Sequence, residues 1–149
     1  MNPRPKIHVL FLCTGNSCRS QMAEGWTRAL EGDRIEAFSA GLEAHELNPL
    51  AVQVTAEAGV DISGHKSKTV ADLPTREFDF VVTVCDDAHE SCPLFPAQTK
   101  VVHAGFDAPP SMVQSATTEE EALAHYRRVR GEIRAFVETL PDTPTTERT

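Results

Sequence analysis

Cysteine, arginine and serine side chains stand together in one short stretch whose spacing suits nucleophilic chemistry on an oxyanion. The stretch runs from Cys13 to Ser20 and reads Cys-Thr-Gly-Asn-Ser-Cys-Arg-Ser. It follows an apolar run over residues 7–12 and precedes a helix-like run over about residues 21–30. A strand, a tight loop and the start of a helix are therefore predicted in that order.

The predicted loop has the residues needed to hold a tetrahedral oxyanion against a nucleophile. Backbone N–H groups at a helix start can point inward, where the helix dipole is positive, and Gly15 and Asn16 tolerate the φ and ψ values that this needs. Arg19 would offer two parallel donors to the anion. Cys13 would lie beneath it as a thiolate whose pKa the same groups lower. The predicted oxyanion-binding residues are Thr14, Gly15, Asn16, Ser17, Cys18, Arg19 and Ser20.

The composition is that of a globular protein with an excess of acidic residues. The chain has 149 residues, a net charge of −8, 40 % hydrophobic residues and 24 % charged residues. Such a charge disfavours nucleic acid and anionic membranes as partners, so the anion site has to be built locally. No apolar run approaches the ~20 residues of a membrane span. Residues 1–12 faintly resemble a signal peptide, but their apolar run is too short and lacks a small-residue cleavage site. We expect a cytoplasmic monomer.

Strands and helices are predicted to alternate along the chain. Strands are expected at residues 7–12, 35–40, 78–84 and 101–105, and helices at 47–58 and from Thr118 to Leu140, with a short, loosely held one at 86–91. The pattern Thr118-Glu-Glu-Glu121 has the form of a capping box. We therefore predict an α/β fold with a small four-stranded parallel sheet and helices on both faces. Residues 1–140 would form a single catalytic domain, and residues 141–149 a frayed tail.

Three further side chains are predicted to assist Cys13. Asp107 follows a strand in a loop stiffened by two prolines, where a carboxyl could protonate a leaving oxygen; its simpler role is that of a turn residue. Cys85 also follows a strand, and Cys92 lies seven residues later. A Cys85 thiolate could attack the sulfur of Cys13 once that sulfur carries the oxyanion, which would release the central atom reduced. Arsenate can be reduced in this way and phosphate cannot, and Cys92 could then attack the disulfide.

The loop resembles the phosphate loop of low-molecular-weight protein tyrosine phosphatases. Two more motifs, Val-Thr-Val-Cys-Asp-Asp-Ala-His-Glu-Ser-Cys-Pro and Gly-Phe-Asp-Ala-Pro, make residues 6–140 similar to the thioredoxin-coupled arsenate reductases, which share the phosphatase fold. The resemblance implies arsenate as substrate and thioredoxin as partner. It also implies Cys13 as nucleophile, Arg19 as oxyanion clamp, Asp107 as acid, and Cys85 and Cys92 as the redox relay.

The same resemblance suggests supporting roles within and near the loop. Ser20 should support the Cys13 thiolate, and Asn16 should hold the shape of the loop. Cys18 is not part of the relay in this family, and we interpret it as a small residue packed under the loop.

One departure from the family concerns a potassium ion that some members bind near the loop. Asn16, Glu24 and Ser39 match ligands of that ion, but Lys68 stands where the family has an aspartate. We expect the Lys68 ammonium to replace the ion and to pair with Glu24; the alternative is a solvated surface lysine. No metal or other cofactor is expected.

Two other functions remain open on sequence alone. A tyrosine phosphatase would usually carry aromatic residues beside the loop and after Asp107, where Ala108 and Pro109 stand here. A redox-sensing or metal-binding protein without turnover is the second alternative. A zinc site is disfavoured because the C-x6-C pair is too widely spaced and the C-x4-C pair lies in the anion loop. The six histidines are scattered; His89 could help Cys92 to ionise, but each is most simply a surface or strand residue.

Overall fold

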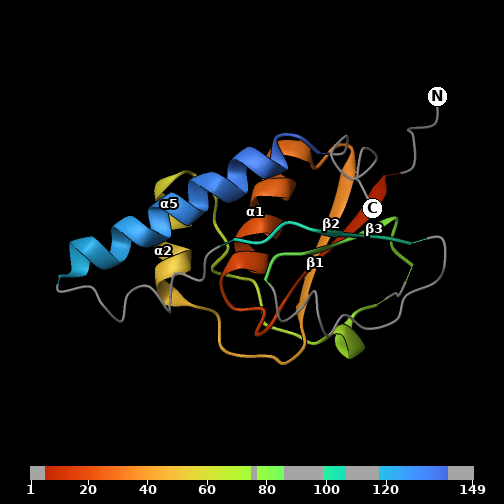
Figure 1. Cartoon of the computed structure of the whole chain (residues 1–149), viewed down its shortest axis with the longest axis horizontal. Coiled ribbons are helices and arrows are strands. Elements are labelled where there is room, and N and C mark those ends of the chain that lie inside the picture. Colours follow the sequence, from red (N-terminus) through yellow and green to blue (C-terminus); the bar gives the residue numbers. More distant parts are fainter. Residues whose placement is uncertain (1–5, 75–76, 86–98, 107–117, 141–149) are drawn as a thin grey trace.

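Four parallel strands form one sheet at the centre of the molecule, in the order β2-β1-β3-β4 (Figure 1). The computed structural model describes residues 6–74, 77–85, 99–106 and 118–140. The strands are β1 (Ile7–Cys13), β2 (Ile35–Gly41), β3 (Phe80–Thr83) and β4 (Lys100–His103). Strand β1 lies inside the sheet, and its apolar residues 9–12 are fully buried, as a parallel strand covered on both sides requires. The predicted α/β fold with four parallel strands is confirmed.

The inner strand aligns the carboxyl ends of its neighbours. Strand β1 pairs with β2 along its whole length and with β3 over four residues. Strands β3 and β4 are shorter than predicted, because the apolar runs continue past the regular ladder. Val84, for example, is still buried and still donates a 2.9 Å hydrogen bond to Leu12 O. As a result Cys13, at the end of β1, and Cys85, just after β3, leave the sheet at the same edge.

The described helices are α1 (Arg19–Glu31), α2 (Pro49–Glu57), the 3₁₀ turn η1 (Val70–Asp72) and α5 (Glu119–Val137). Helix α1 contacts β1 and β2 and packs against α5. It begins two residues earlier than predicted, because Arg19 and Ser20 of the loop already belong to its first turn. Thr118 caps α5 by accepting a hydrogen bond from Glu121 N, as predicted, but the helix ends at Val137. Leu140 is nevertheless buried.

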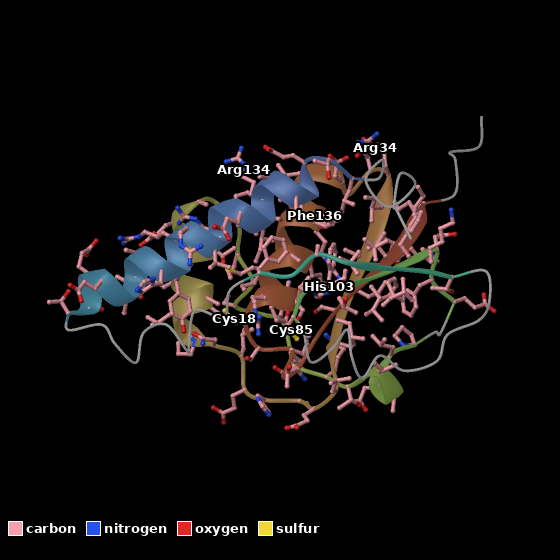
Figure 2. All side chains as sticks on the ribbon, viewed as in Figure 1. Cys18, Arg34, Cys85, His103, Arg134 and Phe136 are labelled. Carbon is pink, nitrogen blue, oxygen red and sulfur yellow. The ribbon has the colours of Figure 1, made fainter. Side chains whose placement is uncertain are left out.

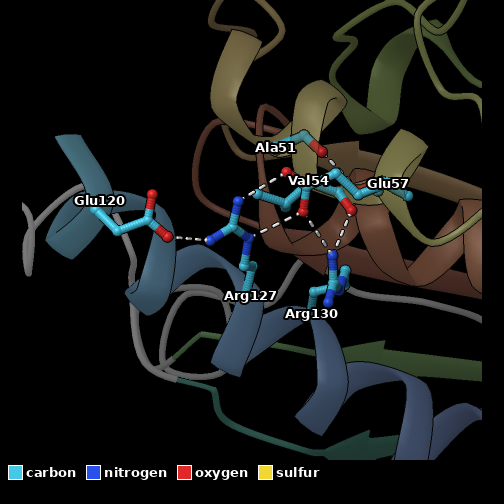
Figure 3. A network of polar contacts seen from close by, with 7 residues as sticks. Ala51, Val54, Glu57, Glu120, Arg127 and Arg130 are labelled. Carbon is cyan, nitrogen blue, oxygen red and sulfur yellow. Dashed lines mark hydrogen bonds and ion pairs between the residues drawn. The ribbon is translucent and has the colours of Figure 1, made fainter.

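Ion pairs hold α5 against α2 on the outside of the molecule (Figure 3). Arg127 binds both carboxylate oxygens of Glu57 at 2.9 Å and also pairs with Glu120 at 2.7 Å. Arg130 donates to Glu57 and, at 2.7 Å, to the carbonyl of Val54, which the last turn of α2 leaves available. The arginines hold the pKa of the Glu57 carboxyl below its usual value.

Some sequence predictions fall on segments that are not described. These are the helix expected at 86–91 and the tail at 141–149. Among the helices that the structure does describe, none combines the length and the apolar character needed to cross a membrane.

Candidate active site

The anion loop, residues 13–20, connects the end of β1 to the start of α1. Cys13, the last residue of β1, is buried, with 4 % of its surface exposed. Asn16 has a φ of +51°, the left-handed conformation that asparagine tolerates better than most residues. Of the two loop residues expected to tolerate unusual φ and ψ values, Asn16 adopts a positive φ and Gly15 does not.

A second segment, residues 42–48, lies along the outer side of the anion loop; we call it the strap. Four of its N–H groups each donate to a loop carbonyl at N···O distances between 2.9 and 3.1 Å: Leu42 to Cys13, Glu43 to Thr14, His45 to Gly15, and Asn48 to Ser17. The remaining carbonyl in this run, that of Asn16, accepts hydrogen bonds from Gln21 Nε2 and Ser67 Oγ.

These outer contacts decide where the loop N–H groups point. In a trans peptide the C=O and the following N–H lie on opposite sides. Because every carbonyl from residue 13 to residue 17 is bound on the outer side, the N–H groups of residues 14–18 are directed toward the inner side. A run of N–H donors at the start of a helix is a binding site for a tetrahedral oxyanion.

Gly41, the last residue of β2, allows the strap to lie this close to the loop. A Cβ at this position would stand 2.3 Å from Glu43 O, 2.7 Å from Thr14 O and 2.8 Å from Asn16 N. All three are backbone atoms, so none can move aside alone. The site therefore requires a glycine at the end of the neighbouring strand, although its φ is not in the left-handed region.

Asn16 is held by hydrogen bonds on both ends of its side chain. Its Nδ2 donates to Ser20 Oγ at 2.9 Å, and its Oδ1 accepts from Lys68 N at 2.9 Å and from Gln21 Nε2 at 3.1 Å. The Asn16, Ser20 and Gln21 side chains are all fully buried. These contacts fix the left-handed residue and support the shape-holding role that the family resemblance implied for Asn16.

Arg19 reaches from the first turn of α1 toward the end of β4. Its Nη1 donates to Phe106 O at 2.8 Å, and Phe106 N in turn donates to Val84 O at 3.2 Å. Phe106 also packs edge-on against Phe136 of α5, with ring centroids 6.1 Å apart. The guanidinium is thereby fixed at the carboxyl edge of the sheet, next to the residue that precedes Asp107.

The structure brings Cys85 to the nucleophile. The Cys85 side chain lies close enough to Cys13 to raise the pKa of the Cys13 thiol, and both residues are buried. Thr14 Oγ1 lies 3.2 Å from Cys85 Sγ, so the residue after the nucleophile also contacts the second sulfur. Cys85 stands just beyond β3 at the edge where α1 begins (Figure 2). The position of Cys85 that the sequence predicted, beside the loop, is the one observed.

The pKa of Cys13 does not follow the sequence prediction. The neighbouring Cys85 sulfur, which favours the protonated form of Cys13, and burial both raise the pKa of the Cys13 thiol well above its ordinary value. Arg19 and the Thr14 N–H lower that pKa, as predicted, but by less. The prediction was wrong because it considered the loop alone. In a pair of adjacent buried thiols, ionisation of one opposes ionisation of the other, so at most one of the two is a thiolate at any time.

Cys18 is separate from this pair. It is buried, and burial raises its pKa to about 12, although Arg19 lowers it. It therefore stays a thiol at neutral pH, in keeping with a small residue packed under the loop.

Lys68 lies beside the buried Glu24 and Ser39. Lys68 Nζ donates to Ser39 O at 3.3 Å, and Ser39 Oγ donates to Glu24 Oε1 at 2.5 Å. The close ion pair of Glu24 is made by Arg28, at 2.7 Å. Burial lowers the pKa of Lys68, and the Glu24 carboxylate raises it. The lysine is thus partly buried, and its ammonium binds the Ser39 carbonyl and not, as predicted, the Glu24 carboxylate.

Other predicted residues fall outside the part of the chain that the structure describes: Cys92, Asp107 and His89. Within the described ranges, no group of three His, Cys, Asp or Glu side chains is placed to hold a metal ion. Sequence reasoning missed the strap and Gln21. The strap has no chemical motif by which it could be recognised. Gln21, in contrast, is a polar residue on the buried face of the helix that follows the loop, and this pattern could have predicted a role in supporting the loop.

Comparison with known proteins agrees with this geometry. A sequence model described as "Low molecular weight phosphotyrosine protein phosphatase" matches residues 8–140. A Bacillus subtilis (strain 168) protein named "Arsenate reductase" is 47 % identical over 135 residues, which cover 88 % of this chain and 95 % of that protein. A solved structure of "An arsenate reductase in oxidized state" has a TM-score of 0.74 at 30 % identity, covering 89 % of this chain and 95 % of the other.

A third similar protein is the Corynebacterium glutamicum "thioredoxin-dependent arsenate reductase". Its structure has a TM-score of 0.64 at 29 % identity, and the match covers 91 % of this chain and 62 % of that one. The family match spans the anion loop, the strap and all the described strands and helices except the first residue of β1. The chain therefore belongs to the low molecular weight phosphotyrosine protein phosphatase family.

Proposed function

We propose that this protein is an arsenate reductase that uses a three-cysteine relay and is recycled by thioredoxin. The observation that carries the proposal is the position of Cys85 beside the anion loop, with its Sγ 3.2 Å from the hydroxyl of Thr14, the residue that follows Cys13. A phosphatase needs only the Cys13 sulfur. A second thiol close to it has a purpose when the bound oxyanion has a central atom that can accept two electrons. The similar proteins named arsenate reductase support the same assignment.

In the first step, the Cys13 thiolate attacks arsenate held by the loop N–H groups and Arg19. A sulfur–arsenic bond forms, the bond from arsenic to one hydroxyl group of arsenate breaks, and this leaving hydroxyl takes a proton and departs as water. Asp107 is the proposed donor of that proton, since it directly follows Phe106, whose carbonyl Arg19 binds. Arg19 neutralises part of the charge on the anion and lies where it can orient it.

In the second step, Cys85 attacks the sulfur of Cys13. A Cys13–Cys85 disulfide forms, the sulfur–arsenic bond breaks, and its electron pair stays on arsenic, which leaves as arsenite. Thr14 Oγ1, 3.2 Å from Cys85 Sγ, can donate a hydrogen bond to the Cys85 thiolate and so favour its ionisation. Because Cys13 is bonded to arsenic at this stage, the pair still carries only one negative charge.

In the third step, Cys92 attacks Cys85, forming a Cys85–Cys92 disulfide and releasing the Cys13 thiolate. A thioredoxin dithiol then reduces the new disulfide and is itself oxidised. The similar protein named as thioredoxin-dependent supports this choice of reductant. Such a cycle requires a reducing compartment, so we propose that the protein acts in the cytoplasm. The proposed catalytic unit is a monomeric domain over residues 1–140.

The test is arsenite release from arsenate with thioredoxin, thioredoxin reductase and NADPH, run beside hydrolysis of p-nitrophenyl phosphate. Sustained arsenite release is expected, with some residual phosphatase activity from the shared loop. Cys92→Ser should release one arsenite per protein and then stop, with a Cys13–Cys85 disulfide that mass spectrometry of peptides can identify. Continued turnover by Cys92→Ser would exclude the relay.

The same assay separates the alternatives. A tyrosine phosphatase would hydrolyse the phosphoester and release no arsenite. A redox-sensing or metal-binding protein would do neither, and a zinc assay with a thiol count under reducing conditions would identify it.

A further part of the proposal concerns the cation near the loop. Lys68 Nζ donates to the carbonyl of Ser39, next to Glu24, so its ammonium supplies a positive charge where some relatives hold potassium. The residues present therefore do not suit a potassium ion.

Potassium and sodium should give equal turnover and equal melting temperatures. Lys68→Asp should become potassium-dependent, whereas the control Lys66→Asp, at an exposed neighbour, should not. Potassium dependence of the unaltered protein would refute this part.

A further inference from the structure

A chain of hydrogen bonds, buried except at its His65 end, reaches the anion loop through Asn16. Its members are His65, Gln21, Asn16 and Ser20. His65 Nδ1 lies 2.9 Å from Gln21 Oε1, Gln21 Nε2 donates to Asn16 Oδ1 at 3.1 Å, and Asn16 Nδ2 donates to Ser20 Oγ at 2.9 Å. Gln21 lies wholly inside the protein, so its amide has no water to satisfy it.

The contacts of Gln21 determine which end of its amide is which. One end faces three acceptors, namely Asn16 O, Asn16 Oδ1 and the carbonyl of Lys66, each at 3.1 Å. That end has to be the NH₂ group, since an oxygen there would face only other oxygens. The other end is then the oxygen, and His65 has to present a hydrogen to it on Nδ1.

The orientation of Asn16 follows in the same way. Its Oδ1 accepts from Gln21 and from Lys68 N, so its NH₂ group has to face Ser20. Ser20 Oγ thus accepts from Asn16, and its own hydrogen is free to be donated elsewhere. Ser20 belongs to the anion loop, which begins at Cys13.

We propose that Gln21 is a positioning residue that fixes the donor direction of this chain, so that Ser20 is held as a hydrogen-bond donor for the Cys13 thiolate. Each link donates toward the loop: His65 to Gln21, Gln21 to Asn16, and Asn16 to Ser20. Reversing any link would turn Ser20 away from donation. Gln21 acts through Asn16 and touches no reacting atom. The inference rests on anion binding by the loop and on Cys13 as nucleophile, and not on arsenate reduction.

Gln21→Glu tests this with almost no change of shape. A carboxylate cannot donate to Asn16 Oδ1, Asn16 O or the Lys66 carbonyl, and it repels all three. The donor to the Cys13 thiolate should then be lost. We expect the pKa of the Cys13 thiol, measured by thiolate absorbance at 240 nm, to rise. The alkylation rate with iodoacetamide at pH 7 should fall about tenfold, and the Kd for inorganic phosphate should rise about tenfold. Gln53→Glu, an exposed glutamine of α2, is the matched control and should change none of these values.

A merely structural role would give a different result. If Gln21→Glu lowers the melting temperature but leaves the thiolate pKa, the alkylation rate and the phosphate Kd unchanged, the proposal is wrong. If the charged variant does not fold, Gln21→Met gives the same comparison, because it keeps the length of the side chain but removes both polar ends. An unchanged pKa of the Cys13 thiol in Gln21→Met would refute the proposed role of Gln21.

The unaltered protein provides a test that needs no variant. Nitrogen-15 NMR of the His65 ring should find the hydrogen on Nδ1. A neutral ring with its hydrogen on Nε2 and a bare Nδ1 would reverse the first link and overturn the proposed direction. These readouts use phosphate and a thiol reagent, so they can fail while arsenate reduction stands, or succeed while it does not.

Discussion

Replacing Gly41 with alanine tests whether the strap directs the anion loop. The added Cβ would lie 2.3–2.8 Å from three backbone atoms of the strap and loop, whereas ordinary contacts begin near 3.4 Å. The neighbouring backbone therefore has to move by about 0.6–1.1 Å. A displacement of that size breaks the 2.9 Å hydrogen bond from Glu43 N to Thr14 O and disturbs the 3.1 Å bond from Leu42 N to Cys13 O.

The expected loss of stability combines overpacking and broken hydrogen bonds. Together these amount to about 3 kcal/mol, which lowers the melting temperature of a domain of this size by roughly 10 °C. Because the Thr14 carbonyl is no longer held outward, the N–H groups of the loop lose their common direction. The Kd for inorganic phosphate should rise by at least about tenfold, and arsenite release should fall in parallel.

The assay is thermal unfolding with and without phosphate, followed by arsenite release with thioredoxin. Gly64→Ala is the matched control, because no other atom lies within 4 Å of its added Cβ. It should change the melting temperature by only a few degrees and leave phosphate affinity unchanged. If Gly41→Ala binds phosphate and melts as Gly64→Ala does, the strap does not determine the direction of the loop N–H groups.

Three further predictions address other contacts. Thr14→Val should slow arsenite release about tenfold without weakening phosphate binding, because it removes the hydroxyl beside Cys85; an unchanged single-turnover rate would contradict this. Asn48→Ala should cost about 1–2 kcal/mol in denaturant unfolding, because the side chain caps α2 and binds Tyr126; a loss below a few tenths would be too small. Glu57→Gln should lower the melting temperature at pH 7. This difference should shrink below about pH 4.5, because the Glu57 carboxylate becomes protonated in the folded protein as the pH falls through its depressed pKa. A difference independent of pH would exclude the ion pairs as its cause.

The sequence was sufficient to predict the sheet and the catalytic edge. Buried parallel strands appear in the sequence as apolar runs, and the residue after each run lies at the carboxyl edge of the sheet. The sequence alone therefore predicted that Cys13 and Cys85 lie at the same edge. The ends of β3 and β4 could not be predicted, because hydrogen-bonding register and not hydrophobicity decides where a ladder stops.

The strap and the state of the thiols could not be predicted for a different reason. The strap binds the loop through backbone atoms, and backbone hydrogen bonds leave no pattern of side chains to recognise. The pKa of Cys13 depends on Cys85, which is distant in sequence, and on burial, which only the tertiary structure defines. The close approach at Gly41 was likewise unpredictable, since the residue appears in the sequence as an ordinary strand end.

The sequence of the anion loop, residues 13–20, is therefore not sufficient by itself to form the anion site. Cys13 and Arg19 are the proposed nucleophile and anion-binding group, but the loop carbonyls would be free to turn inward if the strap and Ser67 did not bind them. An inward carbonyl would repel an oxyanion, so anion binding depends on residues that never contact the anion. It follows that moving the loop sequence alone into another strand–helix junction should not transfer anion affinity, whereas moving it together with residues 41–48 and 65–68 should.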